Sequence, residues 1–147
     1  MASPAKTVKR IRLSVCVLYI AEIFFLTETF FVMDFNGDNK LDHWSILYTF
    51  YNSVSVGVFN LAAVTLAIAL IPVAGFFFFS FDKSRNIKNI YGVLTSAVAV
   101  FLIIAVVPAE SLGIGAVLSL LCYLPIVFLS VLGMFARKNQ VAAQNYR

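Results

Sequence analysis

Long runs of apolar residues alternate with short polar segments along this 147-residue chain. The runs are Leu13–Met33, Ile46–Ile71, Ile90–Val107 and Leu112–Ala136, and only the first of them contains charged residues. A helix of ~18 or more apolar residues, rising ~1.5 Å per residue, is long enough to cross a ~30 Å hydrocarbon layer. The pattern therefore predicts an all-α integral membrane protein, a single domain in which four helices form an up-down bundle and the segment 34–45 is an outer loop.

The second run has an unusual length. It continues without charge through Pro72 and the Phe-rich stretch Phe76–Phe79 to Phe81, which makes 36 residues from Ile46. One helix of that size would measure ~54 Å, which is longer than a bilayer is thick. Proline removes a backbone donor and tends to kink a helix. We expect Pro72 to bend the chain, so that Phe76–Phe79 lies along the inner interface or packs against a partner.

The composition agrees with a membrane location. Hydrophobic residues make up 61% of the chain and charged residues 12%, whereas soluble domains carry about 25% charged residues. The positions of the basic residues indicate membrane topology, and not nucleic-acid binding, as the reason for the net charge of +4. Ten of the eleven basic residues lie beside predicted helix ends, at Lys6, Lys9, Arg10, Arg12, Lys83, Arg85, Lys88, Arg137, Lys138 and Arg147.

This charge pattern predicts the orientation of the chain. Four spans place both termini and the loop around Arg85 on one side, and the positive-inside rule makes that side the cytoplasm. Basic residues at this level also attract anionic lipid of the bilayer. A plasma-membrane or endomembrane location is favoured over a mitochondrial one, which the acid-free start 1–12 leaves open.

Small residues recur along the last two predicted helices. Gly92, Ser96 and Ala99 follow one another at helical spacing, and so do Gly113, Ala116 and Ser119. Small side chains let helix backbones approach closely in a membrane. We therefore expect these two helices to present small-residue faces for packing or for a partner.

The outer loop has oxygen-bearing residues at alternate positions. They are Asp34, Asn36, Asp38 and Asp42, with Lys40 placed to offer its backbone carbonyl. Such an arrangement aims several hard oxygen ligands at one Ca²⁺ ion. The segment 34–45 resembles an EF-hand or dockerin-type calcium loop, and the resemblance implies a calcium ion held between two helices. Asn39 stands where that loop usually has glycine, and Ser45 stands where it has a bidentate carboxylate, so weak, extracytoplasmic binding is expected. The alternative is a plain Asn36-Gly37 turn.

Two carboxylates lie within the first predicted helix. Glu22 is near its midpoint and Glu28 is closer to the outer surface. A buried charge in a bilayer is costly, and burial favours the neutral acid. Since no Lys or Arg lies within the apolar runs, neutral partners are expected, with Asn60 first and Tyr123 among the alternatives. Glu22 has three open roles: a hydrogen-bonding group that fixes helix packing, a proton- or cation-binding group of a transporter, or a partner for a basic residue of another subunit.

The sequence gives no indication of an enzyme. It has no Gly-rich phosphate loop, no Gly-x-Ser-x-Gly motif and no metal-spaced His pair. The chain is predicted to be a non-catalytic accessory or structural subunit, or a membrane organiser, that joins a larger membrane complex or a homo-oligomer. Its expected binding surfaces are the aromatic face of the second helix, Phe76–Phe79 and the small-residue faces. The alternative is a small proton- or cation-coupled transporter that uses Glu22.

Overall fold

Four long helices dominate the computed structural model, which describes residues 4–34, 37, 39–52, 55–56, 59–81 and 86–145. The long helices are α1 (Pro4–Phe25), α3 (Leu61–Ser80), α4 (Ile87–Val106) and α5 (Ile114–Asn145). Short elements connect them: β1 (Phe31–Met33), β2 (Asp42–Trp44), α2 (Ile46–Asn52), β3 (Ser55–Val56), β4 (Phe59–Asn60) and the 3-10 turn η1 (Ala109–Ser111). The chain is therefore mostly helical, with two small antiparallel hairpins.

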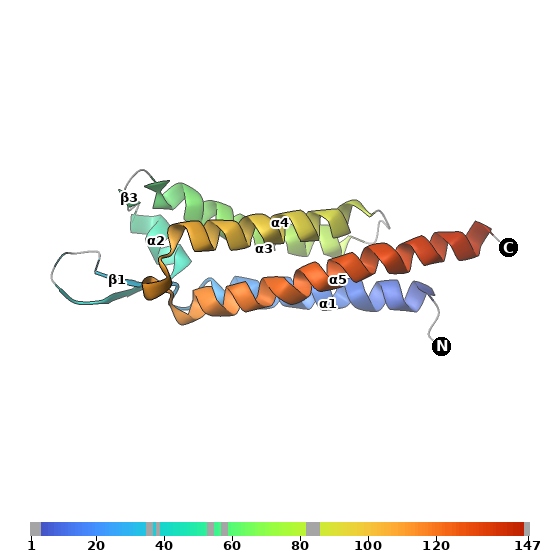
Figure 1. The fold of residues 1–147 in the computed structure, drawn as a ribbon, viewed down its shortest axis with the longest axis horizontal. Helices are drawn as coiled ribbons and strands as arrows, with labels where there is room; N and C mark the ends of the chain where they lie inside the picture. The colour runs from blue at the N-terminus through green and yellow to red at the C-terminus, as the bar shows by residue number, and fades with distance from the viewer. Residues whose placement is uncertain are drawn as a thin grey trace.

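The long helices pack side by side. Helix α1 contacts α3 and α5, and α4 contacts the same two helices. Both chain termini lie at one end of the molecule, while the β1–β2 hairpin, α2 and η1 lie at the opposite end (Figure 1). Helix α5 extends past its neighbours at the end where the termini lie.

Three of these helices are long and apolar enough to cross a membrane: Leu61–Ser80, Ile87–Val106 and Ile114–Asn139. Between 28% and 39% of the residues in their apolar stretches are buried, so most of this surface faces outward. Helix α1 has a similar length, but its first turns carry Lys6, Lys9, Arg10 and Arg12. The described part of the chain thus has the surface of a membrane protein along α3, α4 and α5.

The expected single helix over 46–71 is wrong in its first half. Helix α2 ends at Asn52, a short β3–β4 hairpin follows, and α3 begins only at Leu61. The sequence 53–58 contains three valines and a glycine, which are poor helix formers. This break explains how the long apolar run fits a bilayer. The 20 residues of α3 measure ~30 Å as a helix, which matches the thickness of the hydrocarbon layer.

The Phe-rich stretch also differs from expectation. Helix α3 continues through Pro72 to Ser80, so Phe76–Phe79 completes the helix instead of leaving it. Phe79 is fully buried, and the ring of Phe78 stacks on Tyr91 of α4 with 4.6 Å between centroids. Phe78 and Phe79 thus take part in the α3–α4 packing, while Phe77 is exposed.

The first helix lies earlier in the chain than predicted, from Pro4 to Phe25 instead of 13–33. The chain changes direction after Phe25, and residues 31–33 form strand β1. The segment that follows runs against the start of α5: the Gly113 N–H donates to the Phe30 carbonyl at 3.0 Å, and the Gly115 N–H donates to the Thr29 carbonyl at 2.8 Å. These bonds use backbone donors that the first turn of a helix leaves unpaired. A Cβ at Gly115 would lie 2.6 Å from the Phe25 carbonyl oxygen, so glycine permits this close approach.

The small-residue faces of α4 and α5 pack against other helices. Gly92, Ser96 and Ala99 are buried on α4, and Ala116 and Ser119 are buried on α5. Near the end of the molecule that holds the termini, a Cβ at Gly133 would lie 2.9 Å from the Asn89 Oδ1 atom. The small-residue faces are therefore covered within the protein.

Candidate functional site

A group of polar side chains is buried between the helices around Glu22. The Glu22 side chain is fully buried on α1, three residues before the helix ends. Ser119, Cys122 and Tyr123 of α5 lie close enough to interact with its carboxyl group. These three residues are spaced by three and four positions, which places them on one face of α5.

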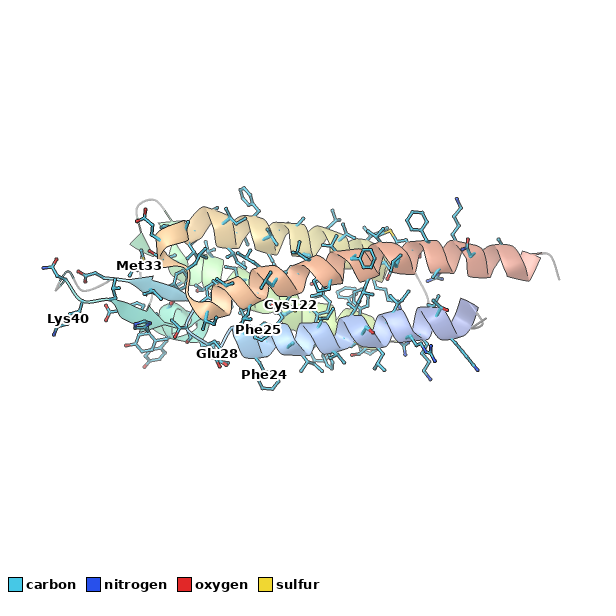
Figure 2. All side chains as sticks on the ribbon, turned by 60° about the horizontal axis from the view of Figure 1, so that its bottom comes forward. Phe24, Phe25, Glu28, Met33, Lys40 and Cys122 are labelled. Carbon is cyan, nitrogen blue, oxygen red and sulfur yellow. The ribbon has the colours of Figure 1, made fainter. Side chains whose placement is uncertain are left out.

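Contacts between α1 and α5 hold this group in place. The Cys122 thiol donates to the Leu18 carbonyl oxygen at 3.4 Å, so Cys122 lies on the side of α5 that faces α1 (Figure 2). Both cysteines, Cys16 and Cys122, are buried and free. Buried free cysteines of this kind behave as small apolar packing residues.

Tyr19 continues the polar group one turn earlier on α1. Its side chain is fully buried, and its hydroxyl lies close to Thr95 and Ser96 of α4. The Tyr19 ring is tilted against Phe79 of α3, with 5.8 Å between centroids. Its ring also faces Gly75, where a Cβ would meet ring atoms at 2.5 to 2.8 Å. Tyr19 therefore joins α1 to α3 and to α4.

Seven buried oxygen atoms in this interior lack a hydrogen-bond partner within the described part of the chain. They are both carboxyl oxygens of Glu22 and the hydroxyls of Tyr19, Ser96, Ser119, Tyr123 and Ser130. A buried polar group without a partner costs ~1–3 kcal/mol. A carboxyl group among hydroxyls can hold a proton or coordinate a small cation through oxygen, so this cluster is the candidate functional site.

One of the predicted partners of Glu22 lies next to it in the structure. Tyr123, one of the alternatives, lies beside the carboxyl group. Asn60 belongs to β4, immediately before α3, and its side chain lies outside the described residues. Glu28 is exposed in the turn that follows α1, where its N–H donates to the Phe25 carbonyl at 3.2 Å (Figure 2). The two glutamates are thus in different environments, and Glu28 is not part of the buried cluster.

Sequence reasoning missed Ser119, Cys122 and Ser96 as members of this cluster. Ser119 and Ser96 were assigned to the small-residue faces, and that stripe was the available signal. The missing information was which helix lies next to α1. Because α5 occupies that position, the polar members of its stripe meet Glu22.

The outer loop forms the end of a β-hairpin. Strands β1 and β2 pair antiparallel, with Met33 opposite Asp42. Strands therefore flank the loop, and the two helices expected from the calcium-loop resemblance are absent from these flanks. Lys40 lies near the hairpin tip (Figure 2). The pairing brings Asp34 and Asp42 to the same end of the hairpin.

The carboxylate of Asp34 organises the loop backbone. Its Oδ1 atom accepts the Gly37 N–H at 2.6 Å, and its Oδ2 atom accepts the Asn39 N–H at 2.8 Å. Asn39, which stands where a calcium loop usually has glycine, has a φ of 62°, the left-handed conformation that glycine adopts most readily. Asn36 and Asp38 lie outside the described residues. Among the residues that are described, no three His, Cys, Asp or Glu side chains gather for a metal ion, and the calcium site stays a prediction.

Comparison of the chain with protein-family models, with curated proteins and with solved structures finds no match.

Proposed function

We propose that this chain is a non-catalytic four-span membrane protein that acts as an accessory or structural subunit, or as a membrane organiser. In this proposal α1 is the fourth span, and its basic first turns lie with the C-terminus at the cytoplasmic surface. Long basic side chains near a helix end can reach the headgroups while their stems stay in the apolar layer.

The observation that carries this proposal is how tightly the interior is filled. Tyr19 and Tyr123 are fully buried at its centre, and the ring of Tyr19 lies directly on the backbone of Gly75. Ser130 is packed in the same way against Gly92. Such contacts lock neighbouring helices together and leave little width for a solute between α1, α3 and α4, which favours a scaffold over a conduit.

The aromatic face of α2 is the surface best suited to a partner. Leu47, Tyr48, Phe50 and Tyr51 are exposed, and Tyr51 has 85% of its surface accessible. The buried side of α2, with Ile46 and Thr49, holds it against the rest of the molecule. Tyrosine and tryptophan favour the headgroup level, where α2 would meet both lipid and the ends of neighbouring membrane proteins. The small-residue faces are not available for this purpose because they are covered within the chain.

Crosslinking in native membranes tests the proposal. We expect a photo-crosslinker at Tyr51 to capture one membrane protein in a fixed ratio, and a Leu47→Ala/Tyr51→Ala variant to lose that complex. A Leu94→Ala/Phe101→Ala variant, which truncates exposed apolar side chains on α4, is the matched control and should keep it. A chain that migrates alone in both variants and in the wild type, with no captured partner, would remove the accessory role.

A second candidate function is supported by one specific observation, the two unpaired oxygens of Glu22. A buried carboxyl group surrounded by Ser119, Cys122 and Tyr123 is suited to proton or cation coupling. This alternative predicts proton or sodium flux in proteoliposomes that contain the purified chain. Glu22→Gln should abolish that flux with assembly intact, whereas Glu28→Gln, an exposed control, should preserve it. Proteoliposomes without flux would exclude the transporter and leave the accessory role standing.

A further inference from the structure

A groove of about 520 Å³ lies beside the last turns of α5. Its lining comes from α5 and from the residue before α4, and consists of Asn86, Val131, Met134, Phe135, Arg137, Lys138 and Val141. The α5 members are spaced mainly by three, four or seven positions, so they form one face of the helix. The groove is thus a continuous strip along α5 with Asn86 at its side.

The groove exists because α5 is longer than its neighbour. Helix α4 meets α5 where Asn89 packs against Gly133, near the start of α4. Helix α5 continues for twelve more residues to Asn145. Beyond the contact at Gly133 the α5 face is left without α4, and Phe135 is 63% exposed there.

Three apolar side chains come first along this strip, the two cationic ones follow, and Val141 lies beyond them. Val131, Met134 and Phe135 belong to the uncharged run that ends at Ala136, and Arg137 and Lys138 follow immediately. Lys138 is exposed and Arg137 is half-buried. Asn86 also lines the groove; it is exposed and makes no side-chain hydrogen bond that caps α4. An amphiphile with an apolar tail and an anionic head matches this order.

We propose that the groove binds one anionic phospholipid. Its acyl chain lies along Val131, Met134 and Phe135, and its phosphate is held between the Arg137 guanidinium, the Lys138 ammonium and the Asn86 amide. Guanidinium and ammonium groups pair well with phosphate oxygens. The site rests on the proposed membrane location of the chain, but not on the choice between accessory subunit and transporter.

The sequence order favours a lipid over a soluble phosphate compound. Arg137 is the first charged residue after a stretch that is long and apolar enough to span a bilayer. This places the cations at the depth of lipid phosphates when the apolar run fills the hydrocarbon layer. A lipid already present at that level occupies the groove without crossing any barrier.

Native mass spectrometry of the purified full-length chain tests the site. Detergent-solubilised protein is titrated with phosphatidylglycerol and, separately, with phosphatidylcholine. We expect one phosphatidylglycerol to bind in preference to phosphatidylcholine. An Arg137→Gln/Lys138→Gln variant should bind it ~25-fold more weakly, about fivefold for each basic side chain. An Arg137→Lys/Lys138→Arg variant keeps both charges and should restore binding.

Two further variants distinguish this site from general charge attraction. Lys9→Gln/Arg10→Gln removes two exposed cations of α1 at the same end of the molecule, and should leave the affinity unchanged. Phe135→Ala should weaken binding while both cations remain. Circular dichroism checks that each variant keeps its helical content.

Several outcomes would overturn the proposal. Equal binding of the two lipids, or equal losses in the α1 and α5 double variants, would mean nonspecific attraction. Glycerol phosphate that competes as well as the intact lipid would exclude a lipid site. A dimer that forms in place of the lipid complex and disappears in Phe135→Ala would assign the groove to a second copy of the chain. None of these results changes the crosslinking expected at Tyr51, so the two proposals fail independently.

Discussion

Replacing Gly75 with alanine is expected to weaken the contact between α1 and α3. The added Cβ would lie 2.5, 2.6 and 2.8 Å from three atoms of the Tyr19 ring, whereas nonbonded carbons pack best at about 3.5–4.0 Å. The ring must therefore move by ~1 Å. Tyr19 is fully buried and also packs against Phe79, one turn further along α3, which limits this movement.

The magnitude follows from two opposing effects. Overpacking a filled core costs ~1–3 kcal/mol, and alanine is better than glycine in a helix interior by ~1 kcal/mol. We therefore expect Gly75→Ala to lower the free energy of unfolding by up to ~2 kcal/mol. In a Tyr19→Leu background the ring is gone, and the same change should be neutral or stabilising. The coupling between the two positions should be ~1–3 kcal/mol.

Thermal or denaturant unfolding in detergent, followed by circular dichroism, measures all four corners of this double-mutant cycle. Leu70→Ala is the control, because Leu70 lies on the exposed face of α3 and should change stability by less than ~0.5 kcal/mol. Equal effects of Gly75→Ala in the wild-type and Tyr19→Leu backgrounds would refute the contact.

Three other perturbations address the remaining features. Gly115→Ala should destabilise the junction of α1 and α5, since the added Cβ would lie 2.6 Å from the Phe25 carbonyl oxygen. An unfolding temperature at or above that of the wild type would contradict this packing. Glu22→Gln should unfold at the same or a higher temperature, because an amide is neutral without the cost of protonating a carboxylate. Glu28→Gln should leave the unfolding temperature unchanged. A large loss of stability in Glu22→Gln would mean that the carboxyl group has a charged partner. Calorimetry should detect calcium binding that Asp38→Ala abolishes, and the absence of heat at millimolar calcium would leave the loop as a plain turn.

The last two long helices illustrate what the hydrophobic pattern can predict. Runs over 90–107 and 112–136 indicated helices there, and the structure has helices at Ile87–Val106 and Ile114–Asn145. Pro108 separates the two runs, and the uniform apolar composition of each run predicts a helix long enough to span the membrane. The extension of α5 to Asn145 was missed because the pattern follows the apolar layer, and a helix can continue beyond it.

The region between Ile46 and Leu61 shows where the same reasoning fails. It has no charge to mark a boundary, so hydropathy alone joins α2 to α3. Local β-branched residues and glycine decide the break, and these are weak signals against an apolar background. Ser119 and Cys122 could not be identified as neighbours of Glu22 for another reason. The pairing of the first long helix with the last depends on tertiary packing, which residue periodicity does not encode.

Site-directed cysteine labelling in intact cells or sealed vesicles most directly tests the four-span arrangement. In a background with Cys16 and Cys122 replaced by alanine, single cysteines are placed at Lys40, in the hairpin, and at Lys6 and Asn139, near the opposite end. A membrane-impermeant maleimide added from outside should label the Lys40 site alone, and the other two only after permeabilisation. Labelling of Lys40 together with Lys6 or Asn139 from the same side, before permeabilisation, would contradict four spans with both termini in the cytoplasm.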